Sequence, residues 1–299
     1  MIRLRLVATL ATALLLSACA VPMRTTLTPE QRGKITELSA HVVVVQDEVI
    51  AAVEASNVSG VIGGGLIGVI IDSKVTNSRV NESQQALGPF YAAIEDVDYR
   101  QEFNASIEKG LAGYPIKVGK VTTTPRAISQ GKLDQLRGQL KTGQALLVIF
   151  PRYTLSGDFR AFDSESVVTI WFRPEVSDSR MPSHRGVLHY QSALVGPGGK
   201  ASLDKWAAND AALFRQVMQE SISETIRMVM IDVDTPVPAN FDKSLQSFSM
   251  NVGAATTQIK GKALKSGNGR TIVLGEDQRL HSLPAASAGA STTTASAQK

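Results

Sequence analysis

Short apolar runs along the middle of the chain predict buried β-strands. Four consecutive valines at 42–45 form the first of these runs, and residues 116–121 form the second. The run ALLVIF at 145–150 carries no charge and is followed by Pro151. Continuous apolar runs are typical of strands that are covered on both faces. We therefore expect 145–150 to be a central strand that ends at the proline.

Amphipathic stretches between these runs predict helices. Asp98 is followed three residues later by Gln101, which is a capping-box-like helix start. Apolar residues then recur at i, i+4 and i+8, on one helix face: Phe103, Ile107 and Leu111. A shorter, polar helix is expected around Leu133–Leu140. A long helix should begin at Ser202 and end near Asp234, with Trp206 on its apolar stripe.

The second half of the chain is rich in strand signals. Apolar and polar residues alternate over 153–159, and strands are also expected at 167–172 and 187–195, with a turn at 163–166 between the first two. Segments 257–264 and 270–274 flank Ser-Gly-Asn-Gly, which predicts a β-hairpin. This hairpin would be either an edge of the main sheet or a small appendage.

The order of these elements predicts an α/β (α+β) fold, with a mixed β-sheet, helices packed on it and a small C-terminal β-hairpin unit. The segment ALLVIFPRYTLSGDF resembles the periplasmic α/β domains of envelope lipoproteins such as the curli-secretion-channel type. The resemblance rests on the pattern of strands and turns over about half of the chain. It implies a similar architecture and carries over no functional residue.

The N-terminus has the layout of a secretory signal peptide. Arg3 and Arg5 precede an uncharged apolar run, which leads to Leu16-Ser17-Ala18-Cys19. The apolar run is too short to span a bilayer, which takes about 20 residues. The last four residues resemble the lipobox of bacterial outer-membrane lipoproteins, and Cys19 is the only cysteine of the chain.

This resemblance implies a covalent diacylglycerol and an N-acyl lipid on Cys19, after cleavage of the signal before it. Several acyl chains together give stable membrane anchoring. In this family an aspartate after the cysteine favours the inner membrane, whereas this chain has Ala20. We therefore expect a mature protein anchored by lipid to the periplasmic face of the outer membrane.

The domain organisation expected from these patterns has five parts. A signal peptide covers 1–18 and a lipidated tether covers 19–34. An α/β periplasmic domain then covers 35–235, and the β-hairpin appendage covers 236–284. Residues 285–299 are rich in Ala, Ser and Thr and are expected to form a disordered tail.

The charge balance argues against a nucleic-acid partner. Loss of Arg3 and Arg5 with the signal leaves 29 of the 31 basic residues, against 27 acidic ones. Binding to nucleic acid requires a concentrated basic patch, and the sequence has no such run. The expected partners are the membrane, through the lipid, and a protein or another component of the cell envelope.

The stretch GVIGGGLIG at 60–68 fits two patterns. Its second half matches the dinucleotide motif G-x-G-x-x-G, but no strand leads directly into it and no acidic residue follows at the required distance. Gly60, Gly64 and Gly68 recur every fourth residue, as in closely packed helices. They could meet the protein's own core, a membrane surface or a second copy in a homo-oligomer. The uncharged run is too short to cross a membrane.

No strong catalytic, cofactor or metal motif appears in the sequence. His184 and His189 lie five residues apart, and Asp158 and Asp163 flank an expected hairpin. Hydrogen-bonded or solvated side chains are the simpler interpretation of all four. We expect a non-enzymatic envelope protein with a structural or partner-binding role. The alternatives are a ligand-binding or hydrolytic periplasmic domain that uses these four residues, or an oligomer assembled through the glycine run.

Overall fold

The computed structural model describes residues 23–46, 49–51, 87–114, 116–173, 181–235, 241, 245–252 and 255–285. The expected lipid-attachment residue Cys19 and the glycine run with Gly60, Gly64 and Gly68 lie outside the described residues. The signal peptide and nearly all of the expected tail also lie outside them.

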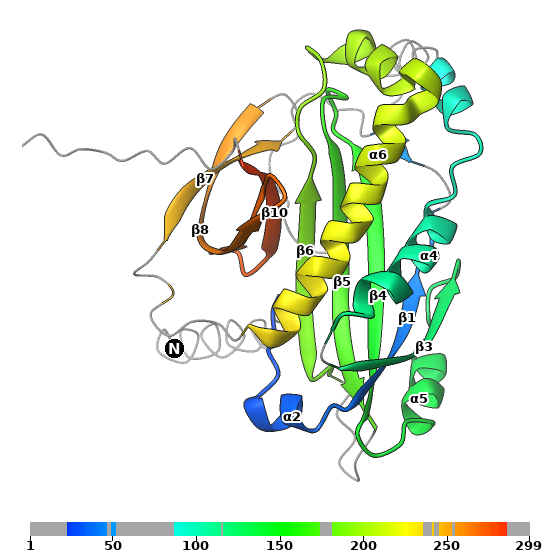
Figure 1. Ribbon diagram of the computed structural model, residues 1–299, viewed down its shortest axis with the longest axis vertical. Helices are drawn as coiled ribbons and strands as arrows, with labels where there is room; N and C mark the ends of the chain where they lie inside the picture. The colour runs from blue at the N-terminus through cyan, green and yellow to red at the C-terminus, as the bar shows by residue number, and fades with distance from the viewer. Residues whose placement is uncertain are drawn as a thin grey trace, which may run out of the picture.

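The described chain forms a mixed ten-stranded sheet with helices packed on it, which confirms the expected α/β class (Figure 1). The strand order is β3-β1-β4-β5-β6-β10-β9-β8-β7, and the short strand β2 pairs with β4. The strands are β1 (Glu37–Val43), β2 (Ile50–Ala51), β3 (Lys117–Thr124), β4 (Gln144–Leu155), β5 (Phe162–Phe172), β6 (His184–Gln191), β7 (Gln246–Val252), β8 (Ala255–Gly267), β9 (Arg270–Gly275) and β10 (Leu280–Pro284).

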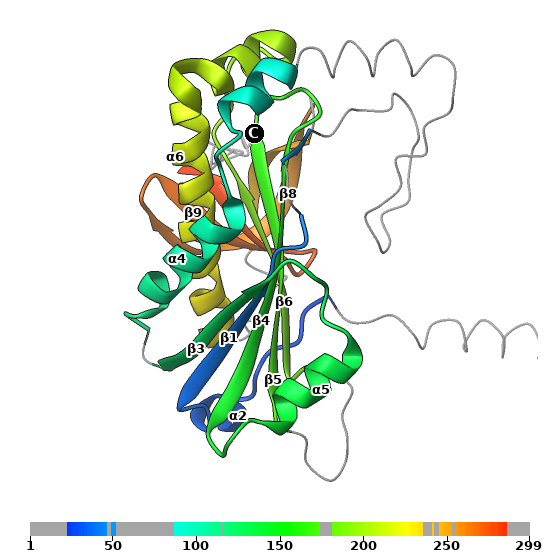
Figure 2. The same cartoon turned by 90° about the vertical axis from the view of Figure 1, so that its right-hand side faces the viewer.

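Helices cover both faces of the sheet (Figure 2). Helices α4 (Tyr99–Leu111) and α6 (Gly199–Asp234) lie on one face, and α5 (Gln130–Gly138) lies on the other. The short helix α2 (Pro29–Gly33) precedes β1. Within the described residues, no helix is both long enough and apolar enough to cross a membrane.

Sequence periodicity explains how the helices attach to the sheet. The Asp98 carboxylate accepts hydrogen bonds from the main-chain N–H groups of Arg100 and Gln101 and so caps α4. The apolar side chains expected on one face of this helix are buried: Phe103, Ile107 and Leu111. Trp206 is fully buried in the core, and its indole N–H donates to the Phe159 carbonyl at 2.7 Å. It therefore anchors α6 on the sheet, as expected.

Pro151 does not end the central strand, contrary to our expectation. Strand β4 continues through it to Leu155 and pairs with β5 along its whole length. On the other side, β1 pairs with β4 as far as Ile149, and β2 begins at Thr154. Pro151 therefore lies where the neighbouring ladder is interrupted, so its missing N–H costs no interstrand hydrogen bond there.

The expected turn at 163–166 is also wrong, because these residues lie inside β5. The chain reverses at Ser156–Ala161, where the Ser156 N–H donates to the Ala161 carbonyl and Asp158 bonds both the Ser156 hydroxyl and the Arg160 N–H. Phe162 and Ser164 point into the core, whereas Asp163 and Glu165 are on the opposite face. Polar residues on both faces made this part of a strand resemble a turn.

Helix α6 ends at Asp234 as expected, but it is not continuous. Ala208 has an extended ψ of 146°, and the next three residues have positive φ angles of 52°, 57° and 51°. Left-handed conformations are costly for residues with a Cβ.

The expected hairpin between β8 and β9 is present, and its Asn268-Gly269 turn has φ of 54° and 70°, as a type I′ turn requires.

The expected tether is attached to the domain over its described part. Thr25 forms an antiparallel bridge with Arg185, with both N–H···O distances at 2.9 Å. Leu27 is buried, and the Thr28 side chain caps α2 in a capping box with Gln31. Proline and polar residues suggested a free linker, but Arg24, Thr25 and Leu27 have partners that are distant in the sequence.

Candidate functional site

Strand β6 contributes polar groups that connect several other elements. One edge of β6 pairs with β5. The other edge bonds Thr25 at Arg185 and pairs in parallel with β10 from Leu188 to Tyr190. The N-terminal segment and the last strand therefore share one strand edge. Alternate side chains of β6 point to opposite faces of the sheet, so this strand contributes to two distinct clusters.

The first cluster lies on the face opposite α6 and is a chain of four titratable side chains. His189 Nε2 is 3.2 Å from an Asp163 carboxylate oxygen, and its Nδ1 is 3.2 Å from Nδ1 of His281. His281 Nε2 is 3.3 Å from both carboxylate oxygens of Asp277. The histidine rings meet edge to face, with centroids 5.4 Å apart. We call this set the histidine chain.

The histidine chain contains more contacts than two neutral imidazoles can satisfy. Each of its three contacts requires one N–H, and two neutral rings supply two. Donation from His189 to Asp163 and from His281 to His189 leaves the His281 Nε2 lone pair facing Asp277. Burial lowers the pKa of His281 and outweighs the opposing effect of Asp277. Protonation of His281 would complete the chain but is disfavoured by its burial.

An ion pair beside the histidine chain strengthens the same junction. The Arg279 guanidinium bonds the Glu165 carboxylate at 2.8 Å and approaches Asp277 at 3.7 Å. Burial opposes ionisation of Asp277, but bonds from His281 and Arg279 hold the pKa of this carboxyl below its usual value. Together these groups join β5 and β6 to the β9–β10 connection.

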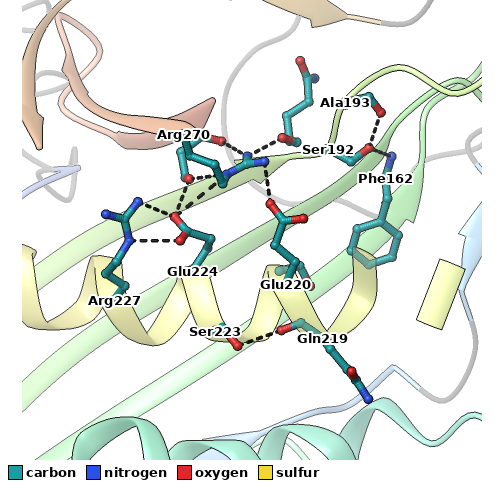
Figure 3. Close-up of polar contacts among 12 residues, drawn as sticks. Phe162, Ser192, Ala193, Gln219, Glu220, Ser223, Glu224, Arg227 and Arg270 are labelled. Carbon is teal, nitrogen blue, oxygen red and sulfur yellow. Dashed lines mark hydrogen bonds and ion pairs between the residues drawn. The ribbon is translucent and has the colours of Figure 1, made fainter. Parts of the chain in front are cut away.

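The second cluster surrounds Arg270 on the α6 face (Figure 3). The Arg270 guanidinium is almost completely buried and donates to Glu220 at 2.9 Å, to the Ser282 hydroxyl at 2.9 Å and to the Gln191 carbonyl. It also lies over the Tyr190 ring, 4.2 Å from the centroid. Arg270 therefore links β9 to α6, β6 and β10, and we call this set the Arg270 cluster.

A second carboxylate completes the Arg270 cluster. Glu224 is one helical turn after Glu220 on α6, and it accepts a hydrogen bond from the Ser282 hydroxyl at 2.7 Å. Arg227 forms a two-pronged ion pair with Glu224, at 3.0 and 2.7 Å. Buried charges are tolerated when they are paired and hydrogen-bonded in this way. The cluster is suited to holding elements together.

The structure separates the two histidines that are five residues apart in the sequence. His184 faces α6, where its Nε2 lies 2.7 Å from an Asp232 carboxylate oxygen. Arg24 forms an ion pair with the other Asp232 oxygen and donates to the Thr235 carbonyl. The side chains of Arg24, His184 and Asp232 are at most 2% exposed. We call this set the N-terminal lock, since it fixes Arg24 to the end of α6.

Asp158 and Asp163 are not brought together as a catalytic pair. Asp158 stabilises the β4–β5 turn, whereas Asp163 belongs to the histidine chain. Asp163 and His189 do meet, because the β5–β6 register places their strands side by side. Sequence reasoning did not connect His281 to them, because it lies 92 residues beyond His189. His41 contacts the Thr122 hydroxyl, between β1 and β3.

A cavity of about 520 Å³ is lined by residues of the 91–97 segment, α4, β4 and α6. Stacked rings of Tyr99 and Tyr153, with centroids 4.0 Å apart, form part of its wall, and burial raises the pKa of Tyr99 to about 12. Neither the histidine chain nor the Arg270 cluster lines it.

Among the described residues, no group of three or more His, Cys, Asp or Glu side chains is placed to hold a metal ion.

Comparisons with known proteins do not identify a family for this chain. No protein-family model matches it, and no curated protein matches it. Among solved structures, the crystal structure of protein XCC0632 from Xanthomonas campestris, of the DUF330 family, matches 71% of this chain and 96% of its own length. The sequence identity is 13% and the TM-score is 0.24. A likeness at this level supports no conclusion about function.

Proposed function

We propose that this chain is a lipid-anchored periplasmic protein of the outer membrane that binds a protein or another envelope component and catalyses no reaction. The observation that carries the proposal is the position of Cys19. Its lipobox-like sequence ends five residues before Arg24, and Arg24 belongs to the N-terminal lock. A lipid at this position would be attached almost directly to a folded domain.

The use of the histidines supports a binding role over catalysis. All four histidines of the chain contact groups on other elements: His41, His184, His189 and His281. A general base must instead lie within reach of a substrate proton or a nucleophile. These histidines hold strands and helices in place, and we assign them no catalytic role.

The open edge of β3 is the surface that we assign to a partner. Among the described residues, β3 pairs with β1 on one side and with no strand on the other. Such an edge presents main-chain N–H and C=O groups that can pair with an extended segment of another chain. Lys120 is exposed on this strand, at the end of the sheet order farthest from β7.

Replacement of Cys19 tests the anchor. We expect the wild-type protein in the membrane fraction, with the added mass of the lipid on the N-terminal peptide. Cys19→Ser should appear in the soluble periplasmic fraction, whereas the control Ser17→Ala retains the cysteine and should remain with the membrane. Unchanged fractionation of Cys19→Ser would refute the anchor.

In-cell photo-crosslinking tests the binding surface. A photo-reactive residue at Lys120 should give discrete adducts that mass spectrometry can identify. The matched control places the same residue at Lys109, which is exposed on α4. Adducts with a second copy of this chain would indicate a homo-oligomer through the β3 edge. Equal adduct patterns from the two positions would contradict a role for this edge.

A further inference from the structure

The N-terminal lock limits how far the folded domain can move from a lipid on Cys19. Arg24 is fixed by Asp232 and Thr235, and Thr25 is fixed by Arg185. Cys19 lies five positions before Arg24, and an extended chain spans at most about 3.5 Å per residue. The lipid-bearing residue can therefore be no more than about 17 Å from Arg24.

This distance is short compared with the sheet. Strand β4 has twelve residues, which corresponds to a length of about 40 Å. A domain attached within about 17 Å of the lipid cannot turn every side to the membrane. The surfaces close to Arg24 must remain near the lipid. They include the C-terminal end of α6 and the strands that follow β10 in the order of the sheet, which are β9, β8 and β7.

One of these nearby strands carries a stripe of positive charge. Strand β8 contains Lys260, Lys262 and Lys265, and neither β7 nor β8 contains an acidic residue. Among the described residues, no salt bridge joins any of the three lysines to a carboxylate. The nearest acid along the ladder is Glu276, whose main-chain N–H donates to the Lys260 carbonyl.

A β-bulge places the three lysines on one face of β8. Lys260 and Lys262 are two residues apart and therefore point to the same side. Lys265 would point to the other side in a regular strand, but the register shifts between Ala263 and Lys265. As a result Lys262 lies opposite Leu274 and Lys265 lies opposite Ile272, two residues that share a face of β9. We call this set the lysine stripe.

The lysine stripe lies within the range of the lipid. Lys262 shares a ladder row with Leu274, Leu280 and Leu188. Thr25 lies one strand from β6, three residues before that row. Two strand spacings of about 4.8 Å and three residues of about 3.3 Å give a diagonal distance across the sheet of about 14 Å from Thr25 to Lys262. This is comparable with the reach of the chain from Arg24 to Cys19.

We propose that the lysine stripe of β8 rests on the anionic phospholipid surface to which Cys19 anchors the protein. This proposal rests on the proposed function, since the lipid supplies the proximity. Each lysine near an anionic surface contributes about 1 kcal/mol, which corresponds to about a five-fold change in occupancy. The stripe would thereby fix the orientation of the domain and leave the β3 edge facing away from the lipid.

The test couples the chain from Cys19 to Lys299 through its single thiol to maleimide lipid in phosphatidylcholine vesicles, with or without phosphatidylglycerol. A water-soluble amine-acylating reagent then labels the lysines, and mass spectrometry measures the rates. We expect acylation of Lys260, Lys262 and Lys265 to be at least about five-fold slower on the anionic vesicles. Lys109 on α4 serves as the internal control and should react at the same rate on both.

Variants separate charge from simple proximity. The double variant Lys262→Gln/Lys265→Gln retains Lys260 as a reporter. In this variant the acylation rate of Lys260 on anionic vesicles should approach its rate on neutral vesicles. The matched control, Lys109→Gln with Lys132→Gln, should retain the difference. Equal slowing of Lys260 and Lys109 would overturn the proposal. Because the coupling is chemical, this result is independent of whether Cys19 is acylated in the cell.

Discussion

Replacement of Asp232 with Asn removes the negative charge at the centre of the N-terminal lock. The Arg24 guanidinium, 2% exposed, would then be buried without a counter-charge. Loss of one partner from a buried ion pair costs about 3–5 kcal/mol. Asn retains the shape and part of the hydrogen bonding, so we expect a value near the lower limit, about 3 kcal/mol. For a domain of this size that lowers Tm by about 6–12 °C.

Asp234 provides a matched control two residues further along α6. It also pairs with an arginine of the N-terminal segment, Arg32, at 2.7 Å, but its side chain is 41% exposed. Exposed ion pairs contribute about 0–1 kcal/mol. Asp234→Asn should therefore lower the free energy of unfolding by less than about 1 kcal/mol. The two variants differ mainly in the burial of the pair.

Urea unfolding followed by tryptophan fluorescence measures the difference. Trp171 and Trp206 are both buried and will report on loss of the core. The wild type and the two variants should have the same m value, so that the midpoints compare stability directly. Equal loss of stability in both variants would refute the reasoning, as would a loss below about 1 kcal/mol for Asp232→Asn.

Two further predictions concern the clusters at β6. Since burial lowers the folded-state pKa of His281, the unfolded chain binds more protons below pH 6.5, and stability should fall as the pH falls from there. His281→Gln should reduce this slope, measured by urea unfolding near pH 7 and near pH 5.5, and an unchanged slope would contradict the assignment. Burial also lowers the pKa of His41, so part of the pH dependence of stability should remain in this variant. Arg270→Met should destabilise the fold by about 1.5–3 kcal/mol, because Glu220, the Ser282 hydroxyl and the Gln191 carbonyl each lose a charged hydrogen-bond donor. Arg270→Lys should recover only part of this loss in thermal unfolding, and full recovery would show that the fork geometry of arginine is not required.

The sequence was sufficient to predict the elements whose own apolar pattern shows which faces are buried. Phe103, Ile107 and Leu111 repeat at helical spacing, and the structure places all three in the core. The run at 145–150 predicted the central strand because it is apolar on both faces, and the structure buries both. Such patterns reflect burial, and burial of apolar surface is the main contribution to folding stability.

The elements that the sequence misplaced depend on neighbours that are distant along the chain. Pro151 is acceptable inside β4 only because β1 has already ended beside it. The helix interruption at Asn209–Ala211 has no glycine or proline to indicate it. Asp163 and Glu165 belong to a strand because β6 pairs with them on one side. Local patterns contain no information about these partners.

The clusters were harder to predict than the fold. The histidine chain brings together Asp163, His189 and His281 through the β5–β6 and β6–β10 registers. Its members are too far apart in the sequence to form a recognisable motif. Spacing suggested that His184 and His189 could act together, but the alternation of side chains along a strand sends them to opposite faces.

The long separation between Arg24 and its partners sets the order in which the protein can assemble. Arg24 and Thr235 are 211 residues apart. At about 5–20 residues per second, a ribosome needs about 10–40 s to make that length of chain. During this interval Arg24 has neither Asp232 nor Thr235 to bind. An enzyme that modifies Cys19 would thus encounter an accessible peptide first, and the later formation of α6 would fix the modified end to the finished domain.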